Sequence, residues 1–394
     1  MPIPADNPRL FDFRMTRPPY ESPQSEVLDW IGRLHATAER TRSPDPSAFD
    51  ADAFLVRLRK LLYRYGCSPD KIATRGYEIT DGSHTRWEDM PVYDVVRHPE
   101  GAGTRVRTEL YATMAAAAVD RLYSQDDSPP GDLVHVTCTG YASPSAAQRL
   151  VAKRGWAAQT RVTHAYHMGC YASLPAIRIA SGFLASASAP RAPARVDIVH
   201  NEICTLHLRP ADHSPEQLVV QSLFADGHIR YSVAGHDGTP RDGESASLEV
   251  LSLHEVILPD SAGGIVWMAS DHGMFMSLSR DVPARIAAAA QDFVRVLFAA
   301  VGLDFDRERT RAVFAIHPGG PKVIDVMQAA LELSAAQVSV SRDVLLRHGN
   351  MSSATLPHIW MRIVQASEVP VGTPIVSLAF GPGLTVSGAL MVKR

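Results

Sequence analysis

Short apolar runs and longer amphipathic or alanine-rich segments follow one another along most of the chain. Apolar runs of strand length lie at 133–137, 160–167, 194–199, 227–234, 248–256, 264–268, 312–317, 375–380 and 384–392. Helical segments lie at 25–40, 51–65, 105–123, 172–187, 214–223, 281–300, 321–333 and 341–348. A further helix opens at Ser143-Pro144, with Ser143 as its N-cap. Because strands and helices alternate, the pattern predicts an α/β fold built on a central sheet.

The second part of the chain repeats this succession of elements. The pattern is therefore compatible with two similar α/β halves, residues 1–235 and residues 236–394. A chain of 394 residues is long enough to bury a core in each half. Sequence identity between the halves is too weak to prove a duplication.

Composition narrows the class of protein and of partner. Hydrophobic residues make up 45% of the chain and charged residues 21%, and the net charge is −3, so neither nucleic acid nor an anionic membrane is expected as a partner. No apolar run has transmembrane length, and residues 1–14 lack the apolar stretch of a signal peptide. The four cysteines are too widely spaced to form a disulfide framework, which favours a reduced, cytoplasmic protein.

Three residues are candidates for catalysis. Cys170 follows a predicted strand and precedes a helix, and the free N–H groups and dipole of a helix N-terminus favour a nucleophilic thiolate. His317 ends an apolar strand, and Asn350 lies in a turn before a helix. Side chains at separate strand ends can converge when the fold closes. The alternatives are a packed, inert Cys170 and ordinary turn residues at the other two positions.

Other motifs fail on spacing or context. His164, His167 and Cys170 could approach a zinc ion, but a closed structural site needs four ligands and no second pair lies nearby. The sequence 381–383 lacks the third glycine and the helix of a dinucleotide site, and Pro321 removes an N–H that a P-loop needs. No Gly-x-Ser-x-Gly elbow of a serine hydrolase occurs at a strand end.

Four motifs together resemble a known family. The sequences HMGCYA (167–172), HPGGP (317–321), GNMSSA (349–354) and FGPGLT (380–385) are similar to those of chalcone-synthase-type (type III) polyketide synthases. The order and spacing match from about residue 55 to the end of the chain. The resemblance implies a thiolase fold, with two similar α/β halves in a five-layered αβαβα arrangement, and a homodimer.

The same resemblance implies roles for the three candidates. Cys170 would attack an acyl thioester, and His317 would hold the thiolate as its ionic partner. His317 and Asn350 would donate hydrogen bonds to the enolate oxygen of the second substrate. No bound cofactor or metal is implied; the substrates would arrive as coenzyme A or phosphopantetheine thioesters, brought as acyl-CoA or on an acyl carrier protein.

The resemblance also implies a set of pocket residues. Phe224 and Phe275 match two phenylalanines that guard the access tunnel, although plain core packing is the alternative for each. The further matches are Cys138, Thr139, Cys204, Leu206, His207, Ser352 and Gly383. Met268, Met274 and Met276 surround Phe275 in the sequence and would suit a long alkyl chain, because methionine adapts to irregular apolar ligands; core filling is the alternative.

A cationic run lies in the predicted helix 51–65. Arg57, Arg59, Lys60 and Arg64 either form a solvated helix face or guide the phosphates of coenzyme A, or a carrier protein, to the tunnel mouth.

Two departures from the plant enzymes bear on the product. Residues 225–232 read ADGHIRYS, and Ser143 replaces a methionine that reaches across the plant dimer. These stretches are closer to bacterial ketosynthases that join two β-ketoacyl chains, often carrier-bound, into α-pyrones of the myxopyronin and corallopyronin type or into dialkylresorcinols. An iterative synthase that extends an acyl-CoA with malonyl-CoA is the alternative. The intact Cys170, His317 and Asn350 argue against an inactive homologue, and the lack of a cysteine after Cys204 argues against a thiolase.

Overall fold

A computed structural model describes residues 7–186, 195–235 and 246–394. Its main sheet has nine strands in the order β11-β12-β13-β8-β1-β7-β6-β4-β5. The strands are β1 (Arg9–Thr16), β4 (Asp132–Thr137), β5 (Arg161–Tyr166), β6 (Arg195–Glu202), β7 (Gly227–Ala234), β8 (Leu248–Ile257), β11 (Val313–Ile316), β12 (Pro374–Gly381) and β13 (Thr385–Lys393).

This sheet consists of two similar parts. In the first, β4 is parallel to β5 and β6, whereas β7 runs antiparallel to β6 and β1. In the second, β11 is parallel to β12, and β13 is antiparallel to β12 and β8. Two residue pairs, Arg9↔Glu249 and Leu10↔Leu248, join β1 to β8. The exact division at residue 235 stays a prediction, because residues 236–245 lie outside the described part.

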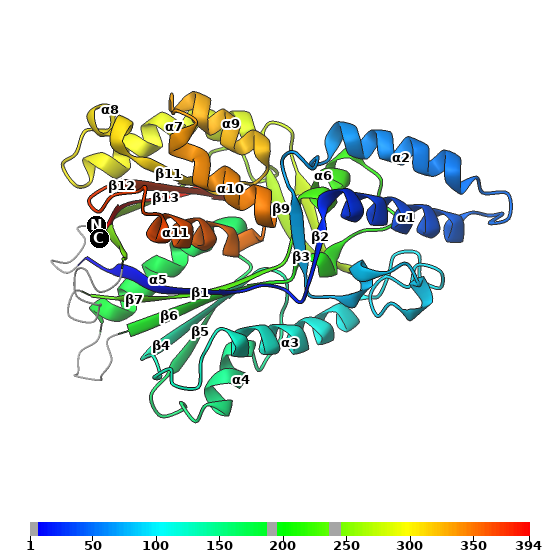
Figure 1. The fold of residues 1–394 in the computed structure, drawn as a ribbon, viewed down its shortest axis with the longest axis horizontal. Helices are drawn as coiled ribbons and strands as arrows, with labels where there is room; N and C mark the ends of the chain where they lie inside the picture. Colours follow the sequence, from blue (N-terminus) through cyan, green and yellow to red (C-terminus); the bar gives the residue numbers. More distant parts are fainter. Residues whose placement is uncertain (1–6, 187–194, 236–245) are drawn as a thin grey trace.

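Helices complete five layers (Figure 1). Helices α3 (Thr104–Arg121) and α4 (Ala146–Lys153) cover the outside of the first part, and α7 (Val282–Ala299) and α9 (Pro321–Ala330) cover the second. Helices α5 (Ser173–Ala185) and α11 (Thr355–Gln365) lie between the two parts. The expected αβαβα thiolase fold is confirmed.

The central position of α5 follows from its composition. Leu174, Ala176, Ile177 and Ala180 are small or apolar and are fully or almost fully buried. They share one core cluster with strand residues of both parts, whereas Arg178 of the same helix is exposed and pairs with Glu255. Burying each large apolar side chain contributes roughly 1.5–3 kcal/mol, which fixes the layer that carries the active-site turn.

The remaining α-helices and strands lie around these layers. They are β2 (Tyr20–Pro23), α1 (Gln24–Arg42), α2 (Ala51–Tyr65), β3 (Thr74–Tyr77), α6 (Pro215–Leu223), β9 (Ile265–Ser270), β10 (Gly273–Leu278), α8 (Phe305–Glu308) and α10 (Ser339–His348). The sequence prediction missed β1, β2, β3, β10, α8 and α11 and placed the start of α4 too early. The N-cap of α4 is Ser145, whose hydroxyl accepts from the Gln148 N–H in a capping box.

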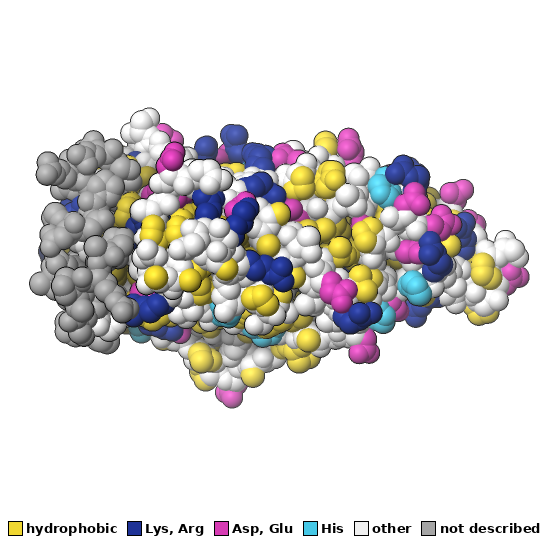
Figure 2. All heavy atoms as spheres, turned by 90° about the horizontal axis from the view of Figure 1, so that it is seen from below, with side chains coloured by type: hydrophobic (Ala, Val, Ile, Leu, Met, Phe, Trp, Pro, Cys, Tyr) yellow, Lys and Arg dark blue, Asp and Glu magenta, His cyan; other side chains and the backbone are white. Residues whose placement is uncertain are grey.

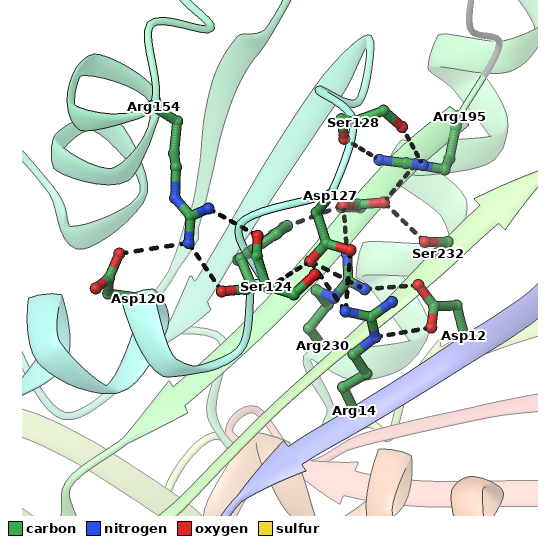
Figure 3. A network of polar contacts seen from close by, with 12 residues as sticks. Asp12, Arg14, Asp120, Ser124, Asp127, Ser128, Arg154, Arg195, Arg230 and Ser232 are labelled. Atoms are coloured by element: carbon green, nitrogen blue, oxygen red, sulfur yellow. Dashed lines mark hydrogen bonds and ion pairs between the residues drawn. The ribbon is translucent and has the colours of Figure 1, made fainter.

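A buried ion-pair cluster ties the first part of the sheet together (Figure 3). Arg230 on β7 donates to Asp197 on β6 at 3.1 Å and to Asp12 on β1 at 2.6 Å. Asp197 also accepts from the Ser232 hydroxyl at 2.8 Å. Since Arg230 and Asp197 are at most 1% exposed, their charges depend on each other for stabilisation.

The surface carries charges of both signs. The face in Figure 2 shows basic, acidic and apolar side chains interspersed, in keeping with the small net charge. Within the described part of the chain, no helix is both long and apolar enough to cross a membrane.

Candidate active site

A cavity of about 1080 Å³ opens where the two parts of the molecule meet. Its wall takes Cys170 from the first part and His317 and Asn350 from the second. The three residues predicted from separate loops are therefore brought to one cavity, as the resemblance implied.

Cys170 lies in a tight 3₁₀ turn, Gly169–Tyr171, that directly precedes α5. Gly169 has φ +78°, and a Cβ there would lie 2.9 Å from the Cδ of Pro382. Only glycine suits this backbone and this close approach. The loop after β12 therefore packs directly on the cysteine turn, which explains why FGPG and HMGC occur together.

His317 continues the line of β11 beyond its last residue. Its N–H donates to the Leu378 carbonyl on β12 at 2.8 Å, which fixes the backbone beside the cavity. The side chain is 1% exposed, and neither ring nitrogen has a hydrogen-bond partner among the described residues. Buried polar atoms are normally paired, so this imidazole is arranged for a partner that enters the cavity.

Asn350 is oriented by its neighbours. Its Oδ1 accepts from the Ser352 N–H at 2.8 Å and from the Thr355 hydroxyl at 3.3 Å. The amide Nδ2 consequently points away from these donors, and it is buried without a partner among the described residues. The backbone of Asn350 pairs with that of Leu223 and Ala225 at 3.0 and 2.8 Å, so the end of α6 and the asparagine form one rigid unit.

Burial controls the protonation of the nucleophile and its partner. It raises the pKa of the Cys170 thiol to about 12, partly offset by the Ser352 hydroxyl. Burial also lowers the pKa of His317 to about 3. Burial thus opposes the charged form of each group taken alone, and the thiolate–imidazolium pair that the resemblance implies stays a prediction. An imidazolium at His317 would favour the Cys170 thiolate, because opposite charges stabilise each other in a buried site.

A buried carboxyl behind the cavity wall was missed by the sequence reasoning. Glu202, at the end of β6, accepts from the Cys138 N–H at 3.0 Å and the Thr139 hydroxyl at 2.8 Å. Burial raises the pKa of Glu202, partly offset by these donors and Ser353. Cys138 in turn contacts the Ser352 hydroxyl at 3.0 Å. The only signal in the sequence was an acidic residue ending an apolar strand.

Six of the predicted pocket residues line the cavity, and three do not. Those that line it are Phe224, Cys138, Thr139, Cys204, His207 and Ser352. Leu206 is buried in the core against the first part of the sheet. Gly383 lies outside the lining, which includes residues 380–382.

The side chain of Phe275 lies on the side of its strand that faces away from the cavity. On β10, Met274 and Met276 line the cavity, so the side chain between them points outward because neighbours on a strand alternate. The Phe275 ring instead lies under the Arg209 guanidinium at 4.9 Å. Met268, paired with Phe275 across the hairpin, is 54% exposed. The expected methionine cluster is thus divided, and Met276 with Phe224 narrows the cavity.

Trp267 is the largest cavity residue that the sequence reasoning missed. It lies on β9, on the inward side shared with Ile265. Its indole Nε1 donates to the Cys138 carbonyl at 2.6 Å, and the ring meets the edge of His207 at 5.7 Å. This hydrogen bond holds the indole beside Cys138. Trp267 therefore forms part of the cavity wall and limits the room for a bound acyl chain.

Comparison with known proteins places this site in a family. Residues 104–237 match the N-terminal domain of the chalcone and stilbene synthases, and residues 249–393 match the C-terminal domain of the same family. The chain belongs to the chalcone and stilbene synthase family. It is 30% identical to the type III polyketide synthase C of Arabidopsis thaliana over 264 residues, which is 66% of each chain. Membership makes it an enzyme of the condensing, acyl-transferring class.

Solved structures of type III synthases share the fold across the whole chain. The type III polyketide synthase domain of Steely1 from Dictyostelium matches with a TM-score of 0.79 and 22% identity, over 98% of this chain and 99% of that one. PKS-I from Ectocarpus siliculosus gives 0.81 and 19%, over 99% of both chains. Tetrahydroxynaphthalene synthase from Streptomyces coelicolor gives 0.75 and 23%, over 98% and 99%.

Among the described residues, no group of three potential ligands is arranged to hold a metal ion.

Proposed function

We infer that the protein is a ketosynthase that forms carbon–carbon bonds between acyl thioesters by Claisen chemistry. The observation that carries this proposal is the set of buried, unpartnered hydrogen-bonding groups around Cys170. The His317 ring and Asn350 Nδ2 have no partner among the described residues, yet they line the same cavity as the thiol. Fixed donors in a dry site stabilise a developing oxyanion strongly.

The first half-reaction loads the cysteine. The Cys170 proton passes to the His317 imidazole, and Sγ attacks the thioester carbonyl. The bond between carbonyl carbon and donor sulfur breaks, and the departing thiolate takes a proton, leaving an acyl group on Cys170. Exchange of one thioester for another is nearly isoenergetic, so a thiol is a suitable acceptor.

The second half-reaction forms the new bond. The second thioester becomes a carbanion by losing CO₂ from a malonyl-type unit or the acidic C2 proton of a β-ketoacyl unit, and its enolate oxygen accepts hydrogen bonds from His317 and Asn350. The carbanion attacks the acyl carbon, the bond from that carbon to Cys170 Sγ breaks, and Sγ leaves as a thiolate that takes a proton from solvent. These residues thus act on both halves of the cycle.

The finer proposal is that two β-ketoacyl chains are joined into an α-pyrone or a resorcinol-type product. The ADGHIRYS stretch and Ser143 favour this branch. The second candidate, iterative extension of an acyl-CoA by malonyl-CoA, is favoured by the match to a plant type III synthase. Mass spectrometry of the products separates them. Two β-ketoacyl thioesters should give one coupled ring product, whereas malonyl-CoA plus acyl-CoA should give a ladder of extended chains only in the second case.

The cavity is expected to prefer aliphatic chains over hydroxycinnamoyl groups. The imidazole of His207 in its wall is already paired: it accepts from Met274 N–H at 3.1 Å and bonds the Thr139 carbonyl at 2.8 Å. A buried phenol without a partner costs about 1–3 kcal/mol, whereas each buried methylene contributes roughly 0.8 kcal/mol. The measurement is kcat/KM for decanoyl and coumaroyl pantetheine, and a higher value for coumaroyl would refute the argument.

Trp267→Ala tests the same wall. Removing the indole should shift the preferred acyl chain to greater length, because the wall beside Cys138 is lost. Met268→Ala is the matched control, since its side chain lies on the opposite, exposed side of the same strand. An unchanged length profile in Trp267→Ala, or the same shift in the control, would contradict this assignment.

A homodimer is also proposed. Strand β5 forms one edge of the main sheet and has no described strand on its outer side, and an open edge is a site for pairing with another chain. Light scattering at micromolar concentration should give twice the 42.9 kDa of one chain. A mass of a single chain would contradict it.

A further inference from the structure

Arg75 is a buried cation on β3, beside the end of α6. It is 3% exposed, and burial lowers the pKa of its guanidinium to about 10, so the group stays charged at neutral pH. Its Nε and Nη2 have no hydrogen-bond partner among the described residues. A buried charge that is incompletely paired costs free energy, so the reason for its position must lie in the contacts of the remaining nitrogen, Nη1.

The Nη1 group of Arg75 binds the carbonyl end of α6. It donates to the Gln221 and Phe224 carbonyls, each at 2.8 Å. The last carbonyls of a helix have no partner within the helix and form the negative end of its dipole. Leu223 and Phe224, at this end of α6, line the catalytic cavity. Arg75 therefore fixes and neutralises a helix end that forms part of the cavity wall.

The same helix end holds the backbone of Asn350. The Asn350 N–H donates to the Leu223 carbonyl at 3.0 Å, and its carbonyl accepts from the Ala225 N–H at 2.8 Å. The turn before it packs on the arginine: Gly349 has φ +70°, and a Cβ there would lie 3.3 Å from Arg75 Cδ. The position of Asn350 thus depends on a segment that Arg75 holds and on a turn that Arg75 contacts.

Strand β3 connects the two segments that meet at Asn350. The Thr74 hydroxyl donates to the Arg347 carbonyl at 2.8 Å, at the end of α10. The Gly76 carbonyl accepts from the Asp226 N–H at 3.0 Å, just after α6. Arg75 lies between these two contacts in the sequence, so its side chain acts where the end of α6 and the end of α10 come together.

We propose that Arg75 is a positioning residue for Asn350. By holding the carbonyl end of α6, it keeps the Asn350 amide aimed at the enolate oxygen. This rests on the proposed ketosynthase function, in which Asn350 serves condensation and Cys170 is acylated without it. A cation that only stabilised the fold would affect the two half-reactions alike.

The experiment measures the two half-reactions separately. Decanoyl pantetheine loads Cys170, and 3-oxodecanoyl pantetheine or malonyl-CoA serves as the second substrate. Arg75→Met should lower the condensation rate about 10- to 100-fold, because a small displacement of a catalytic group is costly, and leave acylation within about twofold. Arg75→Lys keeps the charge without the planar fork, so its condensation rate should lie between those of Arg75→Met and the unaltered chain.

A double variant tests whether Arg75 acts through Asn350. In the Asn350→Ala background, Arg75→Met should lower condensation by no more than about a further twofold, because the group that it positions is already absent. If the two losses multiply instead, Arg75 acts independently of Asn350 and the proposal is wrong.

Arg154→Met is the matched control. The Arg154 side chain is 9% exposed and donates to the Tyr123 and Ser124 carbonyls at 2.8 and 2.7 Å, just beyond the end of α3 (Figure 3). None of these three residues lines the cavity. Arg154→Met should lower the midpoint of thermal unfolding, as Arg75→Met does, but leave condensation unchanged.

Three results with Arg75→Met would overturn the positioning role: equal losses of acylation and condensation, unchanged condensation, or a loss of condensation that Arg154→Met shares. If Arg75→Met does not fold, Arg75→Lys decides, and it must slow condensation while acylation stays unchanged. If the unaltered chain is not acylated, or gives no product with either second substrate, the ketosynthase proposal itself fails.

Discussion

Replacing His317 or Asn350 by alanine is expected to lower the condensation rate about 100- to 1000-fold, because each removes one donor aimed at the enolate oxygen. The two variants should differ in the first half-reaction. His317→Ala should also slow acylation of Cys170, since the thiol loses the base that takes its proton. Asn350→Ala should acylate almost normally. His317→Ala should remain folded, because the ring makes no hydrogen bond to a described residue. Asn350→Ala loses the two bonds that Oδ1 accepts from Ser352 and Thr355, so it should be less stable but still folded.

Acylation and condensation can be measured separately in these variants. Intact-protein mass spectrometry follows the acyl group on Cys170, and product analysis follows the new bond. Equal loss of acylation in both variants would contradict the division of roles. Circular dichroism of each variant provides the control for folding.

The second large effect concerns stability. Arg230→Met is expected to lower the free energy of unfolding by about 3–5 kcal/mol, because it leaves the Asp197 carboxylate, which is fully buried, without one of its partners. Arg230 also lies 4.5 Å above the Tyr123 ring, so packing is lost as well. The midpoint of urea unfolding should fall accordingly.

Arg105→Ala is the control for this prediction. Arg105 pairs with Glu109 on the surface, with side-chain exposures of 84% and 63%, and such pairs contribute at most about 1 kcal/mol. A loss in Arg230→Met no larger than in Arg105→Ala would show that the cluster in Figure 3 does not hold the three strands together.

The sequence alone predicted those features of the fold and the site that local patterns determine. The order of strands and helices predicted the α/β class, and the motifs around Cys170, His317 and Asn350 predicted three residues of one cavity. The central helix α11 was missed although its apolar residues recur at helical spacing, so the signal was in the sequence and was overlooked. Strand β1 was missed because it carries Asp12 and Arg14, which are paired only after the chain has folded.

The cavity wall could not be predicted from motifs alone. Because side chains alternate along a strand, only one of two neighbouring residues can face the cavity. An alignment shifted by one residue therefore assigns Phe275 to the cavity where Met276 lies. The inward positions of Trp267, Met274 and Met276 are consistent with alternation along the hairpin, a signal that was present but not used. The pKa shifts of Cys170 and His317 arise from burial by distant segments, which no local pattern contains.

The central claim is that Cys170 carries the acyl group. The protein is incubated with decanoyl pantetheine, quenched, digested and mapped by mass spectrometry, and Cys170→Ala is treated in parallel. The account predicts a decanoyl increment on the peptide that contains Cys170, none on Cys67, Cys138 or Cys204, and none in the variant. An increment on another cysteine while Cys170 stays free would contradict the account.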